Sequence, residues 1–469
     1  MYHPRSRMRR PRLALGLLLL CLVACRGRGA EEDAVRPLAG AAQGWNLLLL
    51  SIDTLRADRL GAYGYSLRPN SPRLDALLGS GVRFAAAMAP RASTWPALAS
   101  TLTGLYPLAH GVLENGYAFP AALPTLPKRL HGAGYETGAF LSNMCRAGHR
   151  GWDAFACSGG EDGKTVRRAV EWARQRGGER PFLLWVHLFG AHAPYYNGGD
   201  GATRLDPGYK GPVGPKKWQL DRIMRERLPL GPRDVAHLDA LYDAAVAGSD
   251  RLAGNLLDGL RAAGRLERTV VVFLSDHGEE LYDHHGYLYH ACTVYQTGLH
   301  VPLGIAAPGL LAPGGVARDT VELVDVAPTL LALLGLPPLG EAQGRSLLPL
   351  LERPAAEREE RPAFSQYGAE PLHTVLAGGW KLVYNPRGFS PVCIPGAPPD
   401  HFPIARAELY DLARDPGETA NLAEREPARV TRLARLIRQR FAGVRNRAAR
   451  QELPEQLEEE LKSLGYAVP

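Results

Sequence analysis

Two acids and one histidine in this sequence follow apolar runs, and their types suit a divalent metal ion. Asp53 ends the segment WNLLLLSID (45–53), and Asp276 and His277 follow the apolar run of TVVVFLSDHGEE (269–280). Carboxylate oxygen and imidazole nitrogen are ligands that divalent ions take in proteins. We therefore predict that these three side chains bind one ion, Mn²⁺, Zn²⁺ or Ca²⁺. Taken singly, Asp53 has the alternative role of a helix cap and DHGE that of a turn.

The elements that must position these side chains form an α/β pattern. The continuous apolar runs at 45–53, 181–189 and 269–280 predict strands buried on both faces. Helical patterns at 71–81 and 235–264 lie between them. This alternation predicts a large, mostly parallel mixed sheet flanked by helices, and ligands of such sheets gather at the carboxyl ends of the strands. Both acids stand at those ends.

After GRSLLPLLERP (344–354) the pattern changes to short strand-like pieces followed by a basic helix near 427–447. We predict a catalytic domain over 45–350 and a smaller C-terminal α+β subdomain with a tail over 351–469. Val430, Leu433, Ile437, Phe441 and Val444 recur on one face of the expected helix, and its arginines form the other, solvated face.

The first residues have the features of an export signal. Five arginines within the first 12 residues precede LALGLLLLCLVA, which is too short to span a membrane but fits the core of a signal peptide. The run ends in LVAC, which resembles a bacterial lipobox. That resemblance implies a signal peptide over 1–24, a lipid on Cys25, a tether over 25–44, and an exported lipoprotein of the bacterial cell envelope, on the periplasmic side or in the outer membrane. Ordinary cleavage nearby, with Cys25 incidental, is the alternative.

Charge and cysteine usage limit the partners and the compartment. Those arginines account for most of the net charge of +7, so the rest of the chain offers no electrostatic footprint for nucleic acid. Cys145, Cys157, Cys292 and Cys393 lack the CxxC spacing of a zinc knuckle. An oxidising compartment would permit a Cys145–Cys157 loop, and buried free thiols are the alternative. The sequence leaves the oligomeric state open.

The order of motifs resembles the sulfatase family within the alkaline phosphatase superfamily. The resemblance covers nearly everything after the tether and implies an alkaline phosphatase-like fold and hydrolysis of sulfuric or phosphoric esters. The segments that carry it are SIDTLRADRLGAYGY, SPRLDALLGSGVRF, LTGLYPLAHGV, HLFGAHAPY, SDHGEE, VPLGIAAPG, VDVAPTLLALLGL, GRSLLPLL, AELYDLARDPGETANLA and LKSLGYA.

The resemblance also locates the nucleophile, in ASTWPALASTLTG (92–104). The family pattern C/S-x-P-S-R-x-x-x-L-T-G aligns Thr94 with the residue that becomes formylglycine, Ala97 with the serine and Leu98 with the arginine. Threonine cannot form the aldehyde hydrate, but coordination to a divalent metal would activate its hydroxyl. The implied ligand set is Asp53, Thr94, Asp276 and His277, with Thr94 also the covalent nucleophile.

The threonine at the nucleophile position bears on whether the substrate is a phosphoric or a sulfuric ester. A phosphothreonine can be resolved by water attack at phosphorus, whereas the formylglycine route to sulfate release is closed to threonine. Relatives with threonine at this place include phosphodiesterases and phosphoethanolamine or phosphoglycerol transferases. His277 stands where formylglycine sulfatases usually carry asparagine, which favours the phosphoryl-handling branch. Chemistry thus favours a phosphoric ester of an envelope or extracellular glycan or lipid, while global similarity favours a sulfuric ester.

Further histidines follow from the resemblance. His192 in AHAPY and His290 in YLYHACTVY align with residues that face the substrate oxyanion or the leaving group. We predict both as catalytic. His285 in DHHG is a weaker candidate, as a ligand of a second metal ion, and His187 within an apolar run is expected to be structural.

Two other functions remain open at this level. One is a phosphoryl transferase, although such envelope transferases usually carry several membrane spans and this sequence has no such run. The other is a pseudoenzyme that binds sulfated or phosphorylated glycans, because Thr94 and Leu98 replace the family's cysteine and arginine. The combination of Asp53, Asp276 and His277 argues against a site without metal.

Overall fold

The computed structural model describes residues 37–117, 119–145, 151–176, 180–195, 201–356, 361–368, 372–391, 403–444 and 447. These residues all belong to one compact unit, Pro37–Pro469. The predicted signal peptide, the predicted lipidation site Cys25 and also Cys393 lie outside the described residues. None of the helices among the described residues is long and apolar enough to cross a membrane.

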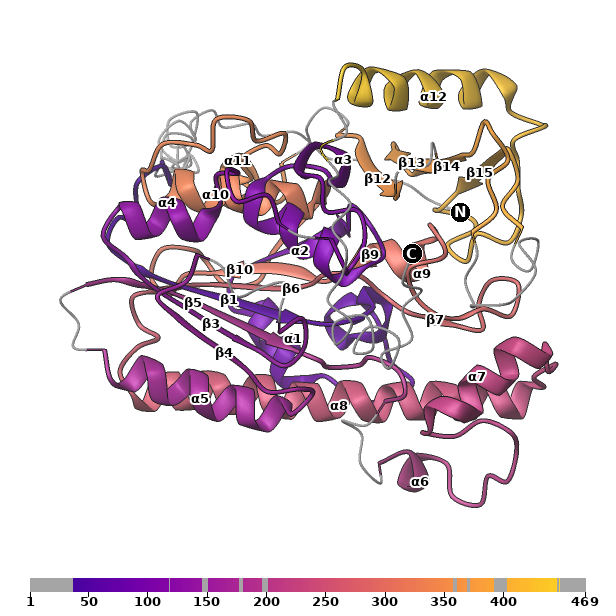
Figure 1. The fold of residues 1–469 in the computed structure, drawn as a ribbon, viewed down its shortest axis with the longest axis horizontal. Helices are drawn as coiled ribbons and strands as arrows, with labels where there is room; N and C mark the ends of the chain where they lie inside the picture. The colour runs from indigo at the N-terminus through magenta and orange to yellow at the C-terminus, as the bar shows by residue number, and fades with distance from the viewer. Residues whose placement is uncertain are drawn as a thin grey trace, which may run out of the picture. The chain divides into compact units, whose positions relative to one another are not determined.

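A large mixed sheet forms the centre of this unit (Figure 1). Among the described residues it has nine strands, in the order β11-β2-β10-β6-β1-β5-β3-β4, with β9 paired to β2. Strand β1 runs parallel to both β5 and β6, while β10 runs antiparallel to β2 and β6. The strands are β1 (Asn46–Ile52), β2 (Val82–Met88), β3 (Glu136–Leu141), β4 (Ala154–Cys157), β5 (Phe182–Leu188), β6 (Thr269–Ser275), β9 (His300–Val301), β10 (Leu303–Ala306) and β11 (Gly315–Glu322).

The apolar run of β1 explains why this strand lies at the centre. Successive side chains of a strand point to opposite faces of a sheet. Leu47 and Leu49 belong to the core cluster on one face, and Leu48 and Leu50 belong to the cluster on the other. Each is at most 1% exposed, so both faces of β1 are buried, as the continuous run predicts.

Helices cover both faces of the sheet, and Figure 1 shows α5 and α8 on one side and α4, α10 and α11 on the other. The predicted α/β architecture is therefore confirmed. The helices are α1 (Pro72–Gly79), α2 (Thr94–Thr103), α3 (Pro107–His110), α4 (Leu126–Gly132), α5 (Asp162–Arg174), α6 (Gly201–Leu205), α7 (Lys217–Glu226), α8 (Pro232–Ala262), α9 (Gln296–Leu299), α10 (Val326–Leu333), α11 (Leu348–Glu352) and α12 (Pro427–Phe441).

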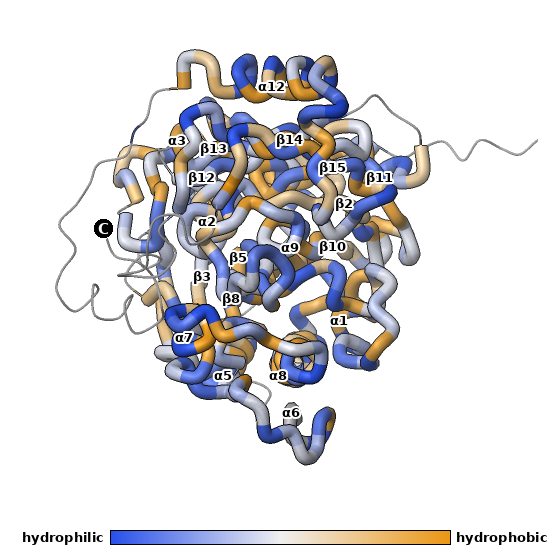
Figure 2. The backbone as a smooth tube through the Cα atoms, turned by 90° about the vertical axis from the view of Figure 1, so that its right-hand side faces the viewer, coloured by the Kyte–Doolittle hydropathy of each residue, from blue (hydrophilic) through white to orange (hydrophobic). Residues whose placement is uncertain are grey.

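A second, smaller sheet follows in the C-terminal part, as predicted. Strands β12 (Ala363–Tyr367), β13 (Leu372–Ala377), β14 (Trp380–Tyr384) and β15 (Ala407–Asp411) pair antiparallel in sequence order. Helix α12 buries Leu433 and Ile437 in the core of this sheet. In Figure 2 its tube alternates between hydrophilic and hydrophobic residues, which is the pattern of a helix with one buried face.

The basic helix ends earlier than predicted, and the predicted domain boundary stays a prediction. We expected the basic helix to extend to residue 447, but α12 ends at Phe441 and Val444 lies beyond it. Ala442 has an extended backbone (ψ 125°), which cannot continue a helix. The predicted domain boundary after residue 350 falls inside α11, and that division of the chain stays a prediction.

Buried charges connect the small sheet to the segment that precedes β9. Lys381 of β14 pairs with Glu418, with Nζ 2.6 Å from Oε1, and the other carboxylate oxygen of Glu418 accepts the backbone N–H of Gln296. The Tyr295 hydroxyl donates to Glu408 of β15 over 3.0 Å. These contacts fix the position of the segment that follows the hairpin of β7 (Glu280–Leu281) and β8 (Leu288–Tyr289).

Candidate active site

The register between β1 and β6 places two carboxylates side by side. Ile52 and Ser275 are paired residues of these parallel strands, and Asp53 and Asp276 directly follow them. Both acids are 0% exposed. Their position at the carboxyl end of adjacent parallel strands is the one predicted from the sequence.

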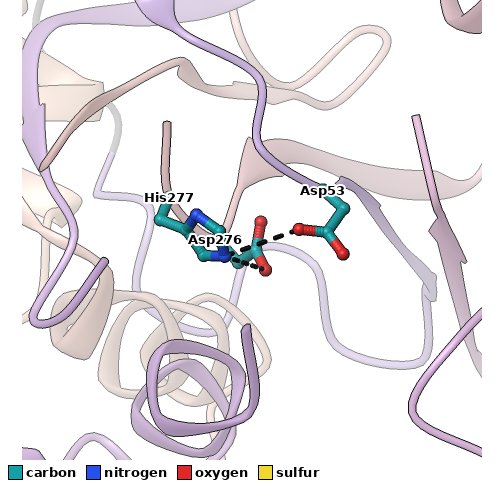
Figure 3. Close-up of side chains that lie close together, drawn as sticks. All are labelled: Asp53, Asp276 and His277. Carbon is teal, nitrogen blue, oxygen red and sulfur yellow. Dashed lines mark ion pairs between the residues drawn. The ribbon is translucent and has the colours of Figure 1, made fainter. Parts of the chain in front are cut away.

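His277 joins these two acids (Figure 3). Its Nε2 lies 3.5 Å from Asp53 Oδ1 and 3.5 Å from Asp276 Oδ2. The other ring nitrogen, Nδ1, donates to the backbone oxygen of Gly278 over 2.9 Å. Because a carbonyl oxygen only accepts hydrogen bonds, the proton is on Nδ1 and the lone pair of Nε2 faces the two carboxylates.

The three side chains fit a divalent metal ion. One ligand atom from each of Asp53, Asp276 and His277 lies within 4.8 Å of the others. Asp53 Oδ1 and Asp276 Oδ2 are buried and accept no hydrogen bond from the described part of the chain. Buried carboxylate oxygens without donors are costly unless a cation satisfies them, and an imidazole lone pair beside them completes a typical donor set.

Burial and mutual charge separate the proton affinities of the two acids. Burial raises the pKa of Asp276 to about 6, and the negative charge of Asp53 adds to this increase. Burial alone would also raise the pKa of Asp53, but the nearby imidazole of His187 and the charges of His192 and His277 hold it below its ordinary value. One carboxylate is therefore ionised at low pH while its neighbour retains its proton longer.

Thr94 lies at the edge of the same cluster. It is the first residue of α2, is 0% exposed, and its Oγ1 is 3.2 Å from Nε2 of His277. Asn115 holds the start of the helix, since its Oδ1 accepts the Ser93 hydroxyl (3.1 Å) and the Trp95 backbone N–H (2.8 Å). The N-terminus of α2 carries partial positive charge, which favours negative charge at the position of Thr94.

The two predicted catalytic histidines lie next to this cluster. The ring of His290 is 4.6 Å from that of His277 and 4.8 Å from that of His192, centroid to centroid. His192 stacks on Phe189 and donates from Nδ1 to the oxygen of Ala193 over 2.5 Å, which leaves the lone pair on Nε2. Burial lowers the pKa of His192 to about 4 and that of His290 to about 3. Both rings are therefore neutral at pH 7.

A family model described as Sulfatase matches residues 45–336, which is more than half of the chain. The chain belongs to the sulfatase family.

The sulfatase resemblance inferred from the sequence is thereby confirmed, and individual relatives agree with it. Arylsulfatase K of Danio rerio is 31% identical over 212 residues, which cover 44% of this chain and 37% of the relative. The match thus spans little more than a third of that relative's length. The family and its sulfatase relatives support an ester-bond hydrolase, and sulfatase-family proteins generally bind a divalent metal ion.

Solved structures with the same fold confirm the alkaline phosphatase-like architecture. One, solved in complex with its substrate D-glucosamine-2-N,6-O-disulfate, has a TM-score of 0.68 and 20% identity and covers 85% of this chain and 98% of its own. The phosphonate monoester hydrolase of Agrobacterium radiobacter has a TM-score of 0.66 and 21% identity, with 88% and 98% covered. At these identities the likeness concerns the fold.

In the alignment expected from the sequence, this sulfatase-family chain departs from the family's nucleophile pattern at Thr94 and at two further positions. Ala97 and Leu98, at the serine and arginine positions, are 0% and 1% exposed, and Leu98 packs in the hydrophobic core. The charged support that arginine would give the nucleophile is therefore replaced by apolar packing. Ser93, one position before Thr94, donates its hydroxyl to Oδ1 of Asn115.

Three residues of the site were not recognised from the sequence. Asn143, after β3, donates from Nδ2 to Asp53 Oδ2 over 2.5 Å. His187, expected to be only structural, has Nε2 3.8 Å from the same oxygen and shares a 2.9 Å hydrogen bond with Ser51, its register partner in β1. His187 lies near the carboxyl end of β5, the neighbour of β1, and Asn143 follows β3, the next strand beyond β5. Their place at the carboxyl ends of parallel strands is the signal that was available.

Glu279 is the third of these residues, two positions after His277. Its Oε1 lies 3.5 Å from Nδ1 of His290, and its Oε2 is buried without a hydrogen-bond partner among the residues that the structure describes. Burial raises the pKa of Glu279 to about 7. Its place in SDHGEE, beside two predicted metal ligands, could have indicated a role at the site.

The weaker candidate His285 is not part of this cluster. It is exposed on the turn between β7 and β8, has a left-handed backbone (φ 52°), and has Nε2 3.5 Å from the Tyr295 hydroxyl. The carboxylate of Glu280 instead contacts His284, the residue before His285, with Oε2 3.0 Å from Nδ1 of His284. The suggestion that His285 binds a second metal ion therefore finds no geometric support.

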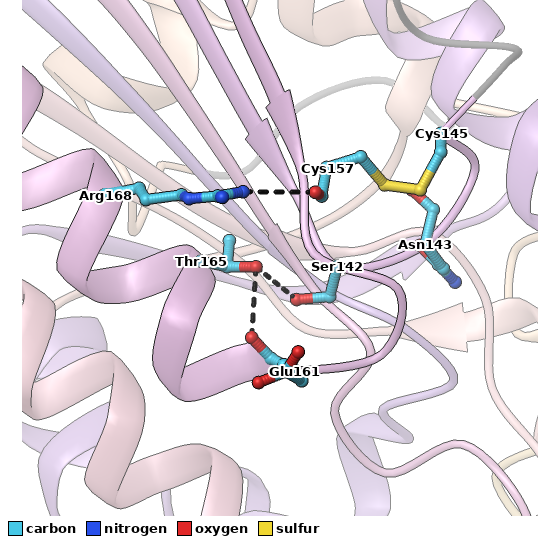
Figure 4. The surroundings of a disulfide bond; sticks show 7 residues. All are labelled: Ser142, Asn143, Cys145, Cys157, Glu161, Thr165 and Arg168. Atoms are coloured by element: carbon cyan, nitrogen blue, oxygen red, sulfur yellow. Dashed lines mark hydrogen bonds between the residues drawn. A yellow bond between two sulfur atoms is a disulfide. The ribbon is translucent and has the colours of Figure 1, made fainter.

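A disulfide closes the turn that carries Asn143 (Figure 4). Cys145 and Cys157 are bonded, with Cα atoms 5.2 Å apart, as one of the two sequence alternatives allowed. Cys292 is disulfide-bonded as well. The Cys145–Cys157 bond joins the residues after β3 to the last residue of β4 and restricts the turn that presents Asn143 to Asp53.

Proposed function

We propose that this chain is a metal-dependent hydrolase that cleaves a phosphoric ester, with a sulfuric ester as the second choice, on a glycan or lipid of the cell envelope or outside the cell. The observation that carries this proposal is the position of the Thr94 hydroxyl, 3.2 Å from the ring nitrogen of His277 that also faces Asp53 and Asp276. A buried hydroxyl at a helix N-terminus beside these groups is placed for nucleophilic attack.

Asp53, Asp276, His277 and Thr94 would hold the ion. A bound Mn²⁺, Zn²⁺ or Ca²⁺ would lower the pKa of the Thr94 hydroxyl and withdraw charge from the transferred group. The Thr94 oxygen would then form a bond to phosphorus while the bond to the leaving oxygen breaks and its electron pair departs with that oxygen. Water attack at phosphorus would then break the bond to the Thr94 oxygen, release phosphate from a monoester or a phosphomonoester from a diester, and restore the threonine.

His192 and His290 would act on the substrate. Both are neutral in the protein, but an incoming anionic ester would raise the pKa of His192 by favouring the charged imidazolium. His192 would then donate a proton from Nε2 to the leaving oxygen, while its Nδ1–H remains bonded to Ala193. Glu279, beside Nδ1 of His290, would orient that ring.

The experiment measures hydrolysis of nitrophenyl sulfate, a nitrophenyl phosphodiester and a nitrophenyl phosphonate monoester by the purified protein with Mn²⁺, Zn²⁺ or Ca²⁺. Thr94→Ala is assayed in parallel. We expect phosphoester turnover that the variant loses. Turnover of the sulfate alone would reject the preference for phosphorus, which is the outcome that likeness to sulfated-glycan enzymes favours. No turnover by a metal-loaded protein would make a glycan-binding pseudoenzyme the better interpretation.

We also propose that the protein works in the bacterial cell envelope as an exported lipoprotein anchored through Cys25. The disulfide between Cys145 and Cys157 supports an oxidising compartment, since structural disulfides are rare in the cytosol. Globomycin, which blocks lipoprotein signal cleavage, tests the proposal by accumulation of the unprocessed chain. Normal processing in its presence would contradict the lipid anchor.

A further inference from the structure

A cavity of about 270 Å³ lies at the end of the large sheet opposite to Asp53. Asn46 and Phe182, the first residues of β1 and β5, line it together with Gly264 and Arg265, which follow α8. Strand β1 has seven residues, which corresponds to about 20 Å along the strand at ~3.3 Å per residue. The cavity is therefore separate from the candidate active site.

Arginine dominates the charge of the cavity lining. Arg176, Arg180, Arg265 and Arg268 line it, and Glu267 is the one acid among the lining residues. These arginines come from two connections, the one between α5 and β5 and the one between α8 and β6. The fold thus gathers cationic side chains that are distant in the sequence.

Contacts within the protein use only part of the arginine hydrogen-bonding capacity. Arg176 pairs with Glu136 (Nε to Oε2, 2.8 Å), and its guanidinium lies 4.5 Å from the ring centre of Trp172. Arg180 donates from Nε to Gly134 O over 3.1 Å. Arg268 makes no ion pair or side-chain hydrogen bond with the described part of the chain. Each guanidinium has five N–H donors, so most of them are available to a ligand.

Helix capping is the competing explanation for these arginines. Arg265 donates to the backbone oxygen of Arg176, just after the end of α5, and cations at helix C-termini are stabilising. That role accounts for Arg265. The same role applies to Nε of Arg180, because its acceptor Gly134 O lies two residues after the end of α4. It does not account for Arg268, which contacts no carbonyl of a final helical turn among the described residues.

We propose that this cavity binds a tetrahedral oxyanion, a phosphate or sulfate group, at a second site that is separate from the catalytic centre. Guanidinium groups match two oxygens of such an anion at once, and several of them around one cavity neutralise a double negative charge. The volume exceeds that of a water site but is below that of pockets for drug-sized ligands, which suits a small anion or an anionic head group.

The test counts phosphate binding to the full-length, metal-loaded protein by equilibrium dialysis with inorganic phosphate. The variant is Arg180→Ala/Arg268→Ala, and the matched control is Arg174→Ala/Arg261→Ala. Arg174 and Arg261 lie near the ends of α5 and α8, the helices that precede the two connections. Their side chains are 62% and 64% exposed and lie outside the cavity lining. We expect wild type and control to bind one more phosphate per chain than the variant, whose affinity at this site falls at least tenfold.

Equal phosphate stoichiometry in wild type and the double variant would overturn the proposal. A folding control and a competition experiment complete the test. Matching unfolding temperatures of wild type and variant ensure that the variant is folded. Dihexanoyl phosphatidylglycerol, used below its micellar concentration, then competes with phosphate for the extra site in parallel with glycerol 3-phosphate. Displacement by the lipid alone assigns the site to a lipid head group. Displacement by glycerol 3-phosphate alone assigns it to a soluble phosphorylated or sulfated ligand.

Discussion

The hydroxyl oxygen of Thr94 lies 3.2 Å from Nε2 of His277, although 183 positions separate the two residues in the sequence. Because the hydroxyl makes this approach, Thr94→Ser should keep a nucleophile that Thr94→Ala removes. We expect the serine variant to retain phosphoester turnover within about tenfold of wild type and the alanine variant to lose about a thousandfold or more. Steady-state kinetics at equal metal content measure both. Activity of Thr94→Ala equal to wild type would reject the assignment.

Metal content should depend on the buried carboxylate of Asp276. Asp276→Asn removes one of two unpartnered carboxylate oxygens, and we expect metal affinity to fall by about a hundredfold or more. Metal saturation at about 100 times Kd stabilises a protein by about 2.7 kcal/mol, so chelation should lower the unfolding temperature of wild type more than that of the variant. His285→Asn is the control. Loss of metal from the control would restore His285 as a ligand.

Proton donation by His192 should depend on the leaving group. Nitrophenolate leaves without a proton, whereas an alkoxide leaving group needs one. We expect His192→Gln to lower kcat/KM about a hundredfold for an alkyl phosphodiester and about tenfold or less for the nitrophenyl ester. Parallel assays of the two esters check this expectation. The same loss for both substrates would limit His192 to binding the oxyanion.

The buried pair of Lys381 and Glu418 should stabilise the protein strongly. Both residues are at most 3% exposed, and Lys381→Met would leave the carboxylate of Glu418 without its cation. Removing one partner of a buried pair costs about 3–5 kcal/mol, while replacing both partners is better tolerated. Urea denaturation should therefore show Lys381→Met to be less stable than Lys381→Met/Glu418→Gln. Equal stability of these variants would mean that the charges do not interact.

Glu322 should make the protein less stable as the pH rises from about 4.5 to about 7. Burial, and then the charge of Asp325, raise its pKa to about 7 from an ordinary value of 4.5. Between these values the folded chain binds more protons than the unfolded chain, so stability contributed by this group is present at low pH and is lost as pH rises. The change amounts to about 3 kcal/mol at 1.36 kcal/mol per pKa unit.

Glu322→Gln tests this pH dependence. The amide oxygen can still accept the Tyr106 hydroxyl and the Phe364 N–H, which both bond to Oε1 of Glu322. Denaturation at pH 5 and pH 7 should show a smaller difference for this variant than for wild type. Glu161→Gln, whose side chain is 64% exposed, is the control and should behave as wild type. An unchanged difference in Glu322→Gln would assign the effect to another group.

The sequence predicted the central strands and the acids that follow them because both depend on local patterns. A continuous apolar run such as 46–52 is buried on both faces when a layer covers each face of the sheet, as helices do in α/β proteins. The acids after two such runs then had to meet if the runs were adjacent and parallel. The order of motifs, through the resemblance to the sulfatase family, indicated that the two runs are adjacent and parallel. The same resemblance placed Thr94, His192 and His290 near this edge of the sheet.

The roles of His187 and His285 show where local pattern fails. His187 lies inside an apolar strand and so had the pattern of a core residue, but its register with Ser51 brings it beside Asp53. His285 stands among histidines and acids in the sequence, yet its turn directs it to solvent. Distances between side chains of different strands depend on strand order and register, which composition and spacing do not encode.

The sequence by itself therefore determined the family, the fold class and the chemical types at the candidate active site. Tertiary structure alone decided which buried groups surround them, including Asn143 at Asp53 and Glu279 at His290. It also gathered Arg180 and Arg268 into one cavity. The physical reason is that secondary structure arises from local periodicity, whereas the surroundings of a side chain arise from the packing of segments that are far apart in the chain.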